Sequence, residues 1–155
     1  MTKGSTVTEA LQDVVARCDA IEECYEFMLA YAARGLPGDA GGGPGTQLRD
    51  LLARAAEAAG GLGAAYARVA LELRLAPAET YQAFLDVLGR DAGNALAAVN
   101  LVLAQPRLSS QLIDNLNASM HLRTLLTDIF LIDETVKIQQ TAAGTSGENV
   151  GEAAG

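Results

Sequence analysis

The chain has 155 residues and a formal net charge of −8, from 11 basic and 19 acidic side chains. Half of the residues are hydrophobic, only 5 % are aromatic, and there is no tryptophan. A chain of this length can bury one substantial core, and its apolar content excludes a disordered protein. The acidity argues against nucleic acid and anionic membrane surfaces as partners, because both attract clustered Lys and Arg.

The first predicted helix runs from about Val7 to Arg34. Thr6 and Glu9 fit a capping box at its start, where each side chain satisfies a backbone amide of the other residue. Gly35 and Pro37 are typical of a helix end. The stretch that follows, residues 35–45 (GLPGDAGGGPG), predicts a flexible linker, because glycine loses much backbone entropy on ordering.

The second predicted helix runs from an N-cap at Thr46 to about Leu75, and its apolar residues alternate spacings of three and four. Glycines at positions 60, 61 and 63 interrupt this pattern. Each glycine costs about 1 kcal/mol relative to alanine inside a helix. We therefore expect a kink or break within residues 60–63.

The third predicted helix begins at Pro77, ends near Leu103 and shows a clean amphipathic stripe. Pro106 separates it from a fourth helix, which Ser109 can cap and which continues to about Gln139. Residues 140–155 are small, polar and glycine-rich, and we expect them to form a disordered tail.

Four amphipathic helices joined by short connections predict an all-α protein with an up-down-up-down four-helix bundle, in one domain spanning residues 1–139. The fourth predicted helix carries a second apolar stripe, which a single bundle would leave exposed. A two-fold symmetric dimer would cover it, so we expect a homodimer. The residues of this second stripe are Leu112, Ile113, Leu116, Met120, Phe130, Leu131 and Ile138.

The helix predicted at residues 7–34 also has a distinctive outer face. It carries six acidic residues against two arginines, half of the net charge of the chain. Most of these acids form a band at Asp19, Glu22, Glu23 and Glu26, beside an aromatic pair, Phe27 and Tyr31, that helical geometry places away from the core seam. An acidic band beside exposed aromatic rings is typical of a protein-binding surface. We predict that Glu22, Glu26, Phe27 and Tyr31 contact a partner protein.

His121 is the only histidine and so the only side chain whose unperturbed pKa lies near neutrality. It supports an alternative function, in which the core of the bundle binds a small molecule or cofactor. The residues that would line such a site are Tyr25, Met28, His121 and Thr124.

A metal site or a catalytic site has little support in the sequence. Bundle di-metal sites need a Glu-x-x-His pair on two helices, and the residue three before His121 is Ala118. Cys18 and Cys24 lie on one helix and point in different directions, so they cannot pair with each other. We expect Cys18 in the core seam and Cys24 nearer the rim. We assign no catalytic residue, metal or cofactor.

Residues 119–127 (SMHLRTLLT) resemble the phospho-acceptor box of sensor histidine kinases, which reads SHELRTPLT and lies on a helix of a dimeric bundle. Aligned on Leu122, Arg123 and Thr124, the phosphorylated position is Met120. The resemblance therefore implies no phospho-acceptor, and extends at most to a helix of a dimeric bundle.

The polar first residues lack a secretory signal, and no window is long and apolar enough for a membrane span. These features, with unpaired cysteines, predict a cytoplasmic protein. The function predicted from the sequence is that of a non-catalytic accessory, assembly or adaptor protein, which binds another protein through the predicted helix at residues 7–34 and self-associates through that helix and the one at residues 109–139.

Overall fold

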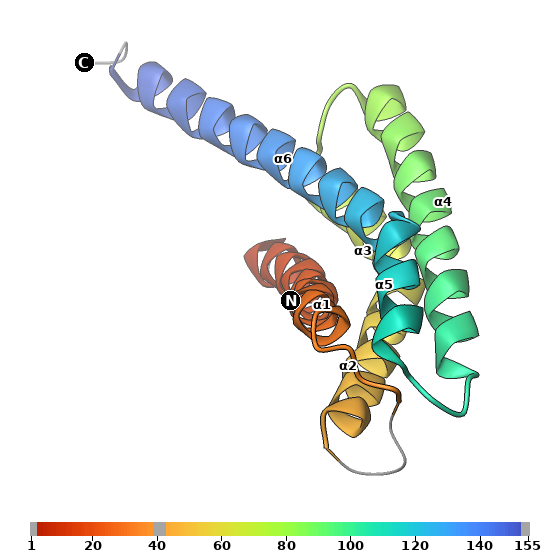
Figure 1. The fold of residues 1–155 in the computed structure, drawn as a ribbon. Coiled ribbons are helices and arrows are strands. Elements are labelled where there is room, and N and C mark those ends of the chain that lie inside the picture. The colour runs from red at the N-terminus through yellow and green to blue at the C-terminus, as the bar shows by residue number, and fades with distance from the viewer. Residues whose placement is uncertain (1–2, 39–42, 153–155) are drawn as a thin grey trace.

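The computed structural model describes residues 3–38 and 43–152, shown as a ribbon in Figure 1. All regular structure in these residues is helical, which confirms the all-α prediction. The count of four helices is wrong, because two of the predicted helices are broken. The six helices are α1 (Lys3–Ala32), α2 (Pro44–Gly60), α3 (Leu62–Glu72), α4 (Ala78–Leu103), α5 (Ser110–Ala118) and α6 (His121–Glu152).

The helices pack in a ring. Helix α1 contacts α2 and α3 on one side and α5 and α6 on the other. Helix α4 contacts the same four helices from the opposite side of the ring. Helices α1 and α4 do not contact each other. The pairs α2–α3 and α5–α6 therefore each act as one broken helix between α1 and α4, and the apolar core lies among all of them.

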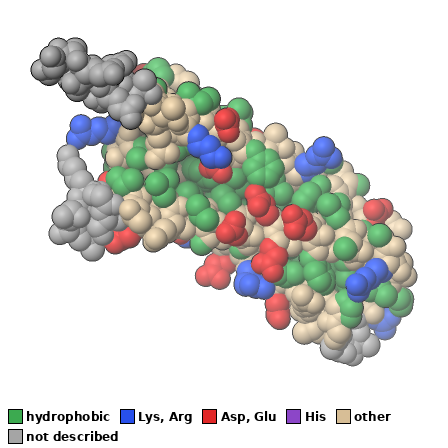
Figure 2. Space-filling model, turned by 90° about the vertical axis from the view of Figure 1, so that its left-hand side faces the viewer, with side chains coloured by type: hydrophobic (Ala, Val, Ile, Leu, Met, Phe, Trp, Pro, Cys, Tyr) green, Lys and Arg blue, Asp and Glu red, His purple; other side chains and the backbone are tan. Residues whose placement is uncertain are grey.

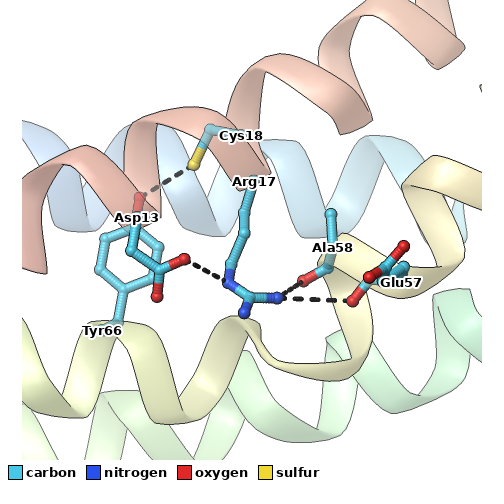
Figure 3. A network of polar contacts seen from close by, with 6 residues as sticks. All are labelled: Asp13, Arg17, Cys18, Glu57, Ala58 and Tyr66. Carbon is cyan, nitrogen blue, oxygen red and sulfur yellow. Dashed lines mark hydrogen bonds and ion pairs between the residues drawn. The ribbon is translucent and has the colours of Figure 1, made fainter.

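The break between α2 and α3 falls at Gly60 and Gly61, as the glycines predicted. The side chain of Arg17 reaches across from α1 to this break (Figure 3). Its guanidinium donates to the carbonyl oxygens of Ala58 at 3.1 Å and Glu57 at 3.4 Å, and its Nε is 3.0 Å from Asp13. A Cβ at Gly61 would stand 2.5 Å from the Arg17 guanidinium, so a larger residue there would require the guanidinium to shift. Arg17 thereby satisfies carbonyls that the end of α2 leaves without a helical partner.

The break between α5 and α6 was not predicted. Helix α5 ends at Ala118 with Ser119 as its C-cap, and Met120 adopts a left-handed backbone with φ 68° before α6 begins. A methionine in this conformation costs about 1 kcal/mol relative to a right-handed one. The predicted cap of this region is confirmed, because the Ser109 hydroxyl accepts from the Leu112 amide at 3.1 Å.

Two other predicted helix starts are wrong. Helix α1 begins at Lys3, so Thr6 lies within it rather than at its N-cap, and α2 begins at Pro44 after Gly43 instead of at Thr46. At the other end of the chain, α6 continues to Glu152, whereas we expected the helix to end near Gln139 and a disordered tail to follow. Residues 39–42 of the predicted linker and 153–155 of the tail lie outside the described residues.

The end of α1 is joined to the start of α5 by a buried polar cluster around Ser110, whose side chain is almost fully buried. The Ser110 hydroxyl donates to the Tyr31 carbonyl and accepts from the Leu36 amide, each at 2.7 Å. The Ser110 amide donates to the Leu36 carbonyl at 2.9 Å, and the Tyr31 hydroxyl donates to the Leu108 carbonyl. Every buried polar group named here has a hydrogen-bond partner, which compensates for the water it loses on burial. The cluster therefore fixes the end of α1 against the start of α5.

Candidate functional site

The acidic face of the molecule lies along α1, the red helix below α6 in Figure 1. Figure 2 looks onto the left-hand side of that view and shows acidic side chains gathered in the middle of the face among hydrophobic ones. A cavity of 260 Å³ opens here between α1, α3 and α6. One part of its lining is apolar and includes Leu11, Val14 and Val15, and the other part is polar. The polar lining residues are Asp19, Glu22, Tyr66, Asp133, Lys137 and Gln140.

The floor of this cavity is a chain of three side chains from three helices. The Tyr66 hydroxyl on α3 donates to Asp133 on α6 at 2.7 Å, and the Cys18 sulfur on α1 lies 3.2 Å from the same hydroxyl. A phenol has one hydrogen, which here goes to the carboxylate, so the Cys18 thiol is the donor to the Tyr66 oxygen. Figure 3 shows Cys18 directed toward Tyr66.

Burial governs the protonation of this chain. It raises the pKa of the Cys18 thiol to about 11 and also raises the pKa of Tyr66. The pKa of Asp133 is raised by burial, although the Tyr66 hydrogen bond and nearby Lys137 act in the opposite direction. The thiol and the phenol are therefore neutral at physiological pH, and neither is a nucleophile there.

The carboxylates at the rim are not neutralised by ion pairs. The salt bridges found among the described residues join Arg17 to Asp13 and Arg68 to Glu9, and none involves Asp19 or Glu22. The pKa of Glu22 is raised by burial first and then by the negative charges of Asp19, Glu26 and Asp133. This mutual repulsion is relieved when a cation binds nearby.

The predicted partner-binding residues do not all lie on the surface. Glu26 is exposed and Glu22 is partly exposed at the cavity rim. Phe27 and Tyr31 do form an aromatic pair, with ring centroids 6.4 Å apart, but Tyr31 is only 2 % exposed and Phe27 packs partly against the core. The exposed placement of Tyr31 that the prediction required is wrong. Helix α1 has neighbouring helices on both sides, so more of its circumference is buried than the single apolar stripe seen in the sequence.

The residues predicted to line a ligand site in the core are not gathered around a cavity. Met28 is completely buried and Tyr25 partly buried on α1, whereas His121 is partly exposed at the first residue of α6. Thr124 is exposed, so its predicted place inside the core is wrong. The cavities found in the described residues are lined by other side chains.

The two cysteines are free and both are buried. Cys18 lies in the core seam as predicted. The prediction that Cys24 lies nearer the rim is wrong, because it is fully buried and its thiol contacts the Met28 sulfur at 3.7 Å. Burial raises the pKa of the Cys24 thiol to about 12, so this residue acts as a small core side chain.

A second cavity, of 420 Å³ and mostly apolar, lies between the start of α4 and the middle of α6. Phe84 and Tyr81 of α4 form one wall, and Leu131 and Ile138 of α6 form the other. Leu131 and Ile138 are both more than half exposed. This groove was not predicted, because the residues that form it belong to two helices far apart in the chain.

Farther along the interface of α4 and α6, Asp128 lies close enough to Asp91 for the two carboxyl groups to affect each other's charge, and Oδ2 of Asp128 is buried without a hydrogen-bond partner among the described residues. Burial, and then the neighbouring carboxyl group of Asp91, raise the pKa of Asp128 to about 7. Asp128 is therefore partly protonated near neutral pH, which allows the two helices to pack without repulsion between like charges.

Sequence reasoning did not single out Tyr66 or Asp133 as functional residues. Tyr66 has the spacing of a core residue, and a phenol needs a hydrogen-bond partner when it is buried. Asp133 directly follows Ile132 and lies one turn from Ile129 and Val136, all buried. Two signals in the sequence could have linked Tyr66 with Asp133. One is a carboxylate next to the apolar stripe of one helix, and the other is a tyrosine within the apolar stripe of another helix.

Among the residues that the structure describes, no group of three or more His, Cys, Asp or Glu side chains is arranged to hold a metal ion. Nor does any described helix combine the length and the apolar character needed to cross a membrane. Comparison of the chain with protein-family models, with curated proteins and with solved structures finds no match.

Proposed function

We propose that this protein is a non-catalytic accessory or adaptor protein that binds a basic segment of another protein at the acidic face of α1. The observation that carries the proposal is the cavity where unpaired Asp19 and Glu22 stand beside the Tyr66–Asp133 pair. Its neutral thiol and phenol favour binding over chemistry at this site.

The shape and lining of the cavity favour a lysine or arginine side chain. Such a side chain has an apolar stem and a charged head. The stem can lie along Leu11 and Val15, and the head can approach Glu22 and Asp133. Lys137 is the one basic residue in the lining, and because it is exposed it can move away from the acids as a partner cation arrives.

The test compares a triple variant, Asp19→Asn with Glu22→Gln and Glu26→Gln, with a matched control that removes three exposed acids on α4 and α5. The control is Glu79→Gln with Asp86→Asn and Asp114→Asn, which changes the net charge equally. Binding to a labelled lysine-rich peptide is measured by fluorescence anisotropy. We expect the triple variant to bind at least about tenfold more weakly, while the control binds like the wild type. Equal losses in both variants would mean that only bulk charge matters.

We also infer that the chain self-associates. Of the two helices predicted to do so, α1 offers less, because Phe27 and Tyr31 are packed inward. The second apolar stripe predicted at residues 109–139 divides between the core and the surface. Ile113 and Leu116 are buried, whereas Met120, Phe130, Leu131 and Ile138 remain exposed. Of the eight large hydrophobic residues that are exposed among the described residues, three lie on α6, more than on any other helix, which supports an interface there.

A further inference from the structure

The outer side of α6 carries three large apolar side chains among its charged ones, where a surface helix would ordinarily be polar throughout. Phe130 is 54 % exposed, Leu131 55 % and Ile138 59 %. At about 100° per residue, Leu131 and Ile138 fall opposite the core-facing residues of this helix. Ile129, Ile132 and Val136 are buried on the core side, so α6 carries apolar side chains on both faces. We call Phe130, Leu131 and Ile138 the outer ridge.

Two residues of the outer ridge, Leu131 and Ile138, line the 420 Å³ groove between α4 and α6, whereas Phe130 lies outside it. Leu131 and Ile138 form one wall of this groove, and Phe84 of α4 contributes to the other. Ridge and groove together form one apolar surface on two helices that already pack against each other. A binding partner could therefore contact both without any rearrangement of the chain.

We propose that a second copy of this chain covers this surface, with the α6 helices of the two copies antiparallel about a two-fold axis near residues 134 and 135. This rests on the proposed self-association and specifies its geometry. Leu131 and Ile138 are two turns apart, about 10 Å at the rise of an α-helix. In an antiparallel pair centred between them, Leu131 of each copy faces Ile138 of the other, so one patch is complementary to itself, as a two-fold interface requires.

The charges between the two apolar residues favour the antiparallel direction. Glu134 and Lys137 are both exposed on α6. About this axis, Glu134 of one copy lies at nearly the same height as Lys137 of the other, within about 3 Å along the helix. At about 100° per residue, both side chains lie on the same edge of the Leu131–Ile138 line, and an antiparallel pair brings the same edge of each copy together. A parallel pair in register would instead put Glu134 of one copy and Lys137 of the other on opposite edges of the interface, where they cannot pair. Self-pairing therefore fits both the apolar and the charged side chains of this surface.

The first test is the mass of the full chain in solution, measured by light scattering after gel filtration at micromolar concentration. We expect the wild type at twice its 16.1 kDa chain mass and the double variant Leu131→Asp with Ile138→Asp at the single mass. The matched control carries Leu71→Asp and Leu101→Asp, which are exposed apolar positions away from the ridge, and should remain dimeric. A double variant that stays dimeric overturns the proposal, as does a control that also dissociates.

The second test does not depend on how well the charged variants fold. Cysteine is introduced singly as Leu131→Cys or Ile138→Cys, and the native cysteines do not interfere because both are buried. Under oxidation, a mixture of the two variants should form a disulfide-linked dimer, while each variant alone should form little, because its two copies of the new cysteine are about 10 Å apart. Efficient cross-linking of either variant alone, or none in the mixture, overturns the antiparallel pairing.

These outcomes separate the two proposals. A wild-type chain of 16.1 kDa in solution would contradict self-association itself. A dimeric wild type with the wrong cross-links would contradict only the geometry. Neither result bears on the acidic face of α1, because Leu131 and Ile138 do not line its cavity.

Discussion

Tyr31 and Tyr66 are the two tyrosines that are almost completely buried among the described residues, and their surroundings differ in a way that separates a structural contact from a candidate site. Tyr31 donates its hydroxyl to a backbone carbonyl next to the fully satisfied Ser110 cluster. Tyr66 donates its hydroxyl to a carboxylate at an open cavity rimmed by unpaired acids. A backbone carbonyl cannot titrate or respond to a ligand, whereas a carboxylate can do both. The comparison teaches that burial alone does not identify a functional residue.

The largest expected effect is on the Tyr31 side of the comparison. Ser110→Ala removes the donor to the Tyr31 carbonyl and the acceptor of the Leu36 amide. We expect a loss of about 2 kcal/mol in the free energy of unfolding, because the buried Leu36 amide loses its side-chain acceptor and the Tyr31 carbonyl keeps only the Arg34 amide as a donor, at 3.2 Å. Urea unfolding followed by circular dichroism measures it. Ser109→Ala is the control, since it removes a single capping bond worth about 1 kcal/mol. A smaller loss for Ser110→Ala than for the control would contradict the importance of the cluster.

A middle-sized effect distinguishes the two tyrosines directly. We expect Tyr66→Phe to cost about 1–2 kcal/mol of stability at pH 8, where its hydrogen bond goes to an ionised carboxylate, and less at acidic pH, where Asp133 is protonated. Tyr31→Phe should cost a similar amount at both pH values, because its acceptor does not titrate. The measurement is urea unfolding of both variants at pH 8 and in mild acid.

The sign of the underlying pH dependence follows from the pKa of Asp133. Because burial raises it in the folded protein, the folded state binds the proton more tightly than the unfolded state. The contribution of Asp133 to stability is therefore fully present below its unfolded pKa and is lost as the pH rises through the folded one. Since the Tyr66 bond opposes the increase, Tyr66→Phe should extend this loss to higher pH. Identical pH profiles for Tyr66→Phe and the wild type would remove Asp133 from the site.

The smallest effect is a difference in thiol reactivity. With a pKa of about 11 for Cys18 and about 12 for Cys24, neither thiol of the folded protein should be alkylated by iodoacetamide at an appreciable rate at neutral pH. As the pH is raised, Cys18 should react first, because it lines the open cavity while Cys24 is fully enclosed. Mass spectrometry of the modified peptides gives the order. Faster modification of Cys24 would mean that the cavity is not open at Cys18.

Local features of the fold could be predicted because they depend on neighbouring residues. The glycines at 60 and 61 predicted the break after α2, and Ser109 predicted the cap of α5. The break at Met120 could not be predicted, because its backbone conformation is unfavourable for methionine and follows from packing instead. The starts at Thr6 and Thr46 were wrong for a related reason, since a good capping residue does not prevent a helix from beginning earlier.

The candidate site was only half predictable. The acidic residues of α1 were visible as a band, and Glu22 and Glu26 lie where that band predicted. The sequence offered no reason to connect Tyr66 and Asp133 with this band. Tyr66 is 48 residues from Cys18 in the chain, and Asp133 is 67 residues from Tyr66. Tyr31 was placed outside, because the periodicity of α1 gives the direction of its buried face and not the width of that face.

The sequence by itself determined that this is an all-helical protein with a broken second segment, an acidic first helix and an apolar surplus near its last helix. These properties follow from helical periodicity, from the backbone freedom of glycine and from charge counts, all of which act within a few residues. Only the tertiary structure decided which aromatic rings are buried, how Cys18, Tyr66 and Asp133 meet, and that Leu131 and Ile138 border a groove. Those outcomes depend on how many helices pack around each face of a given helix, and the sequence of one helix does not specify which other helices pack against it.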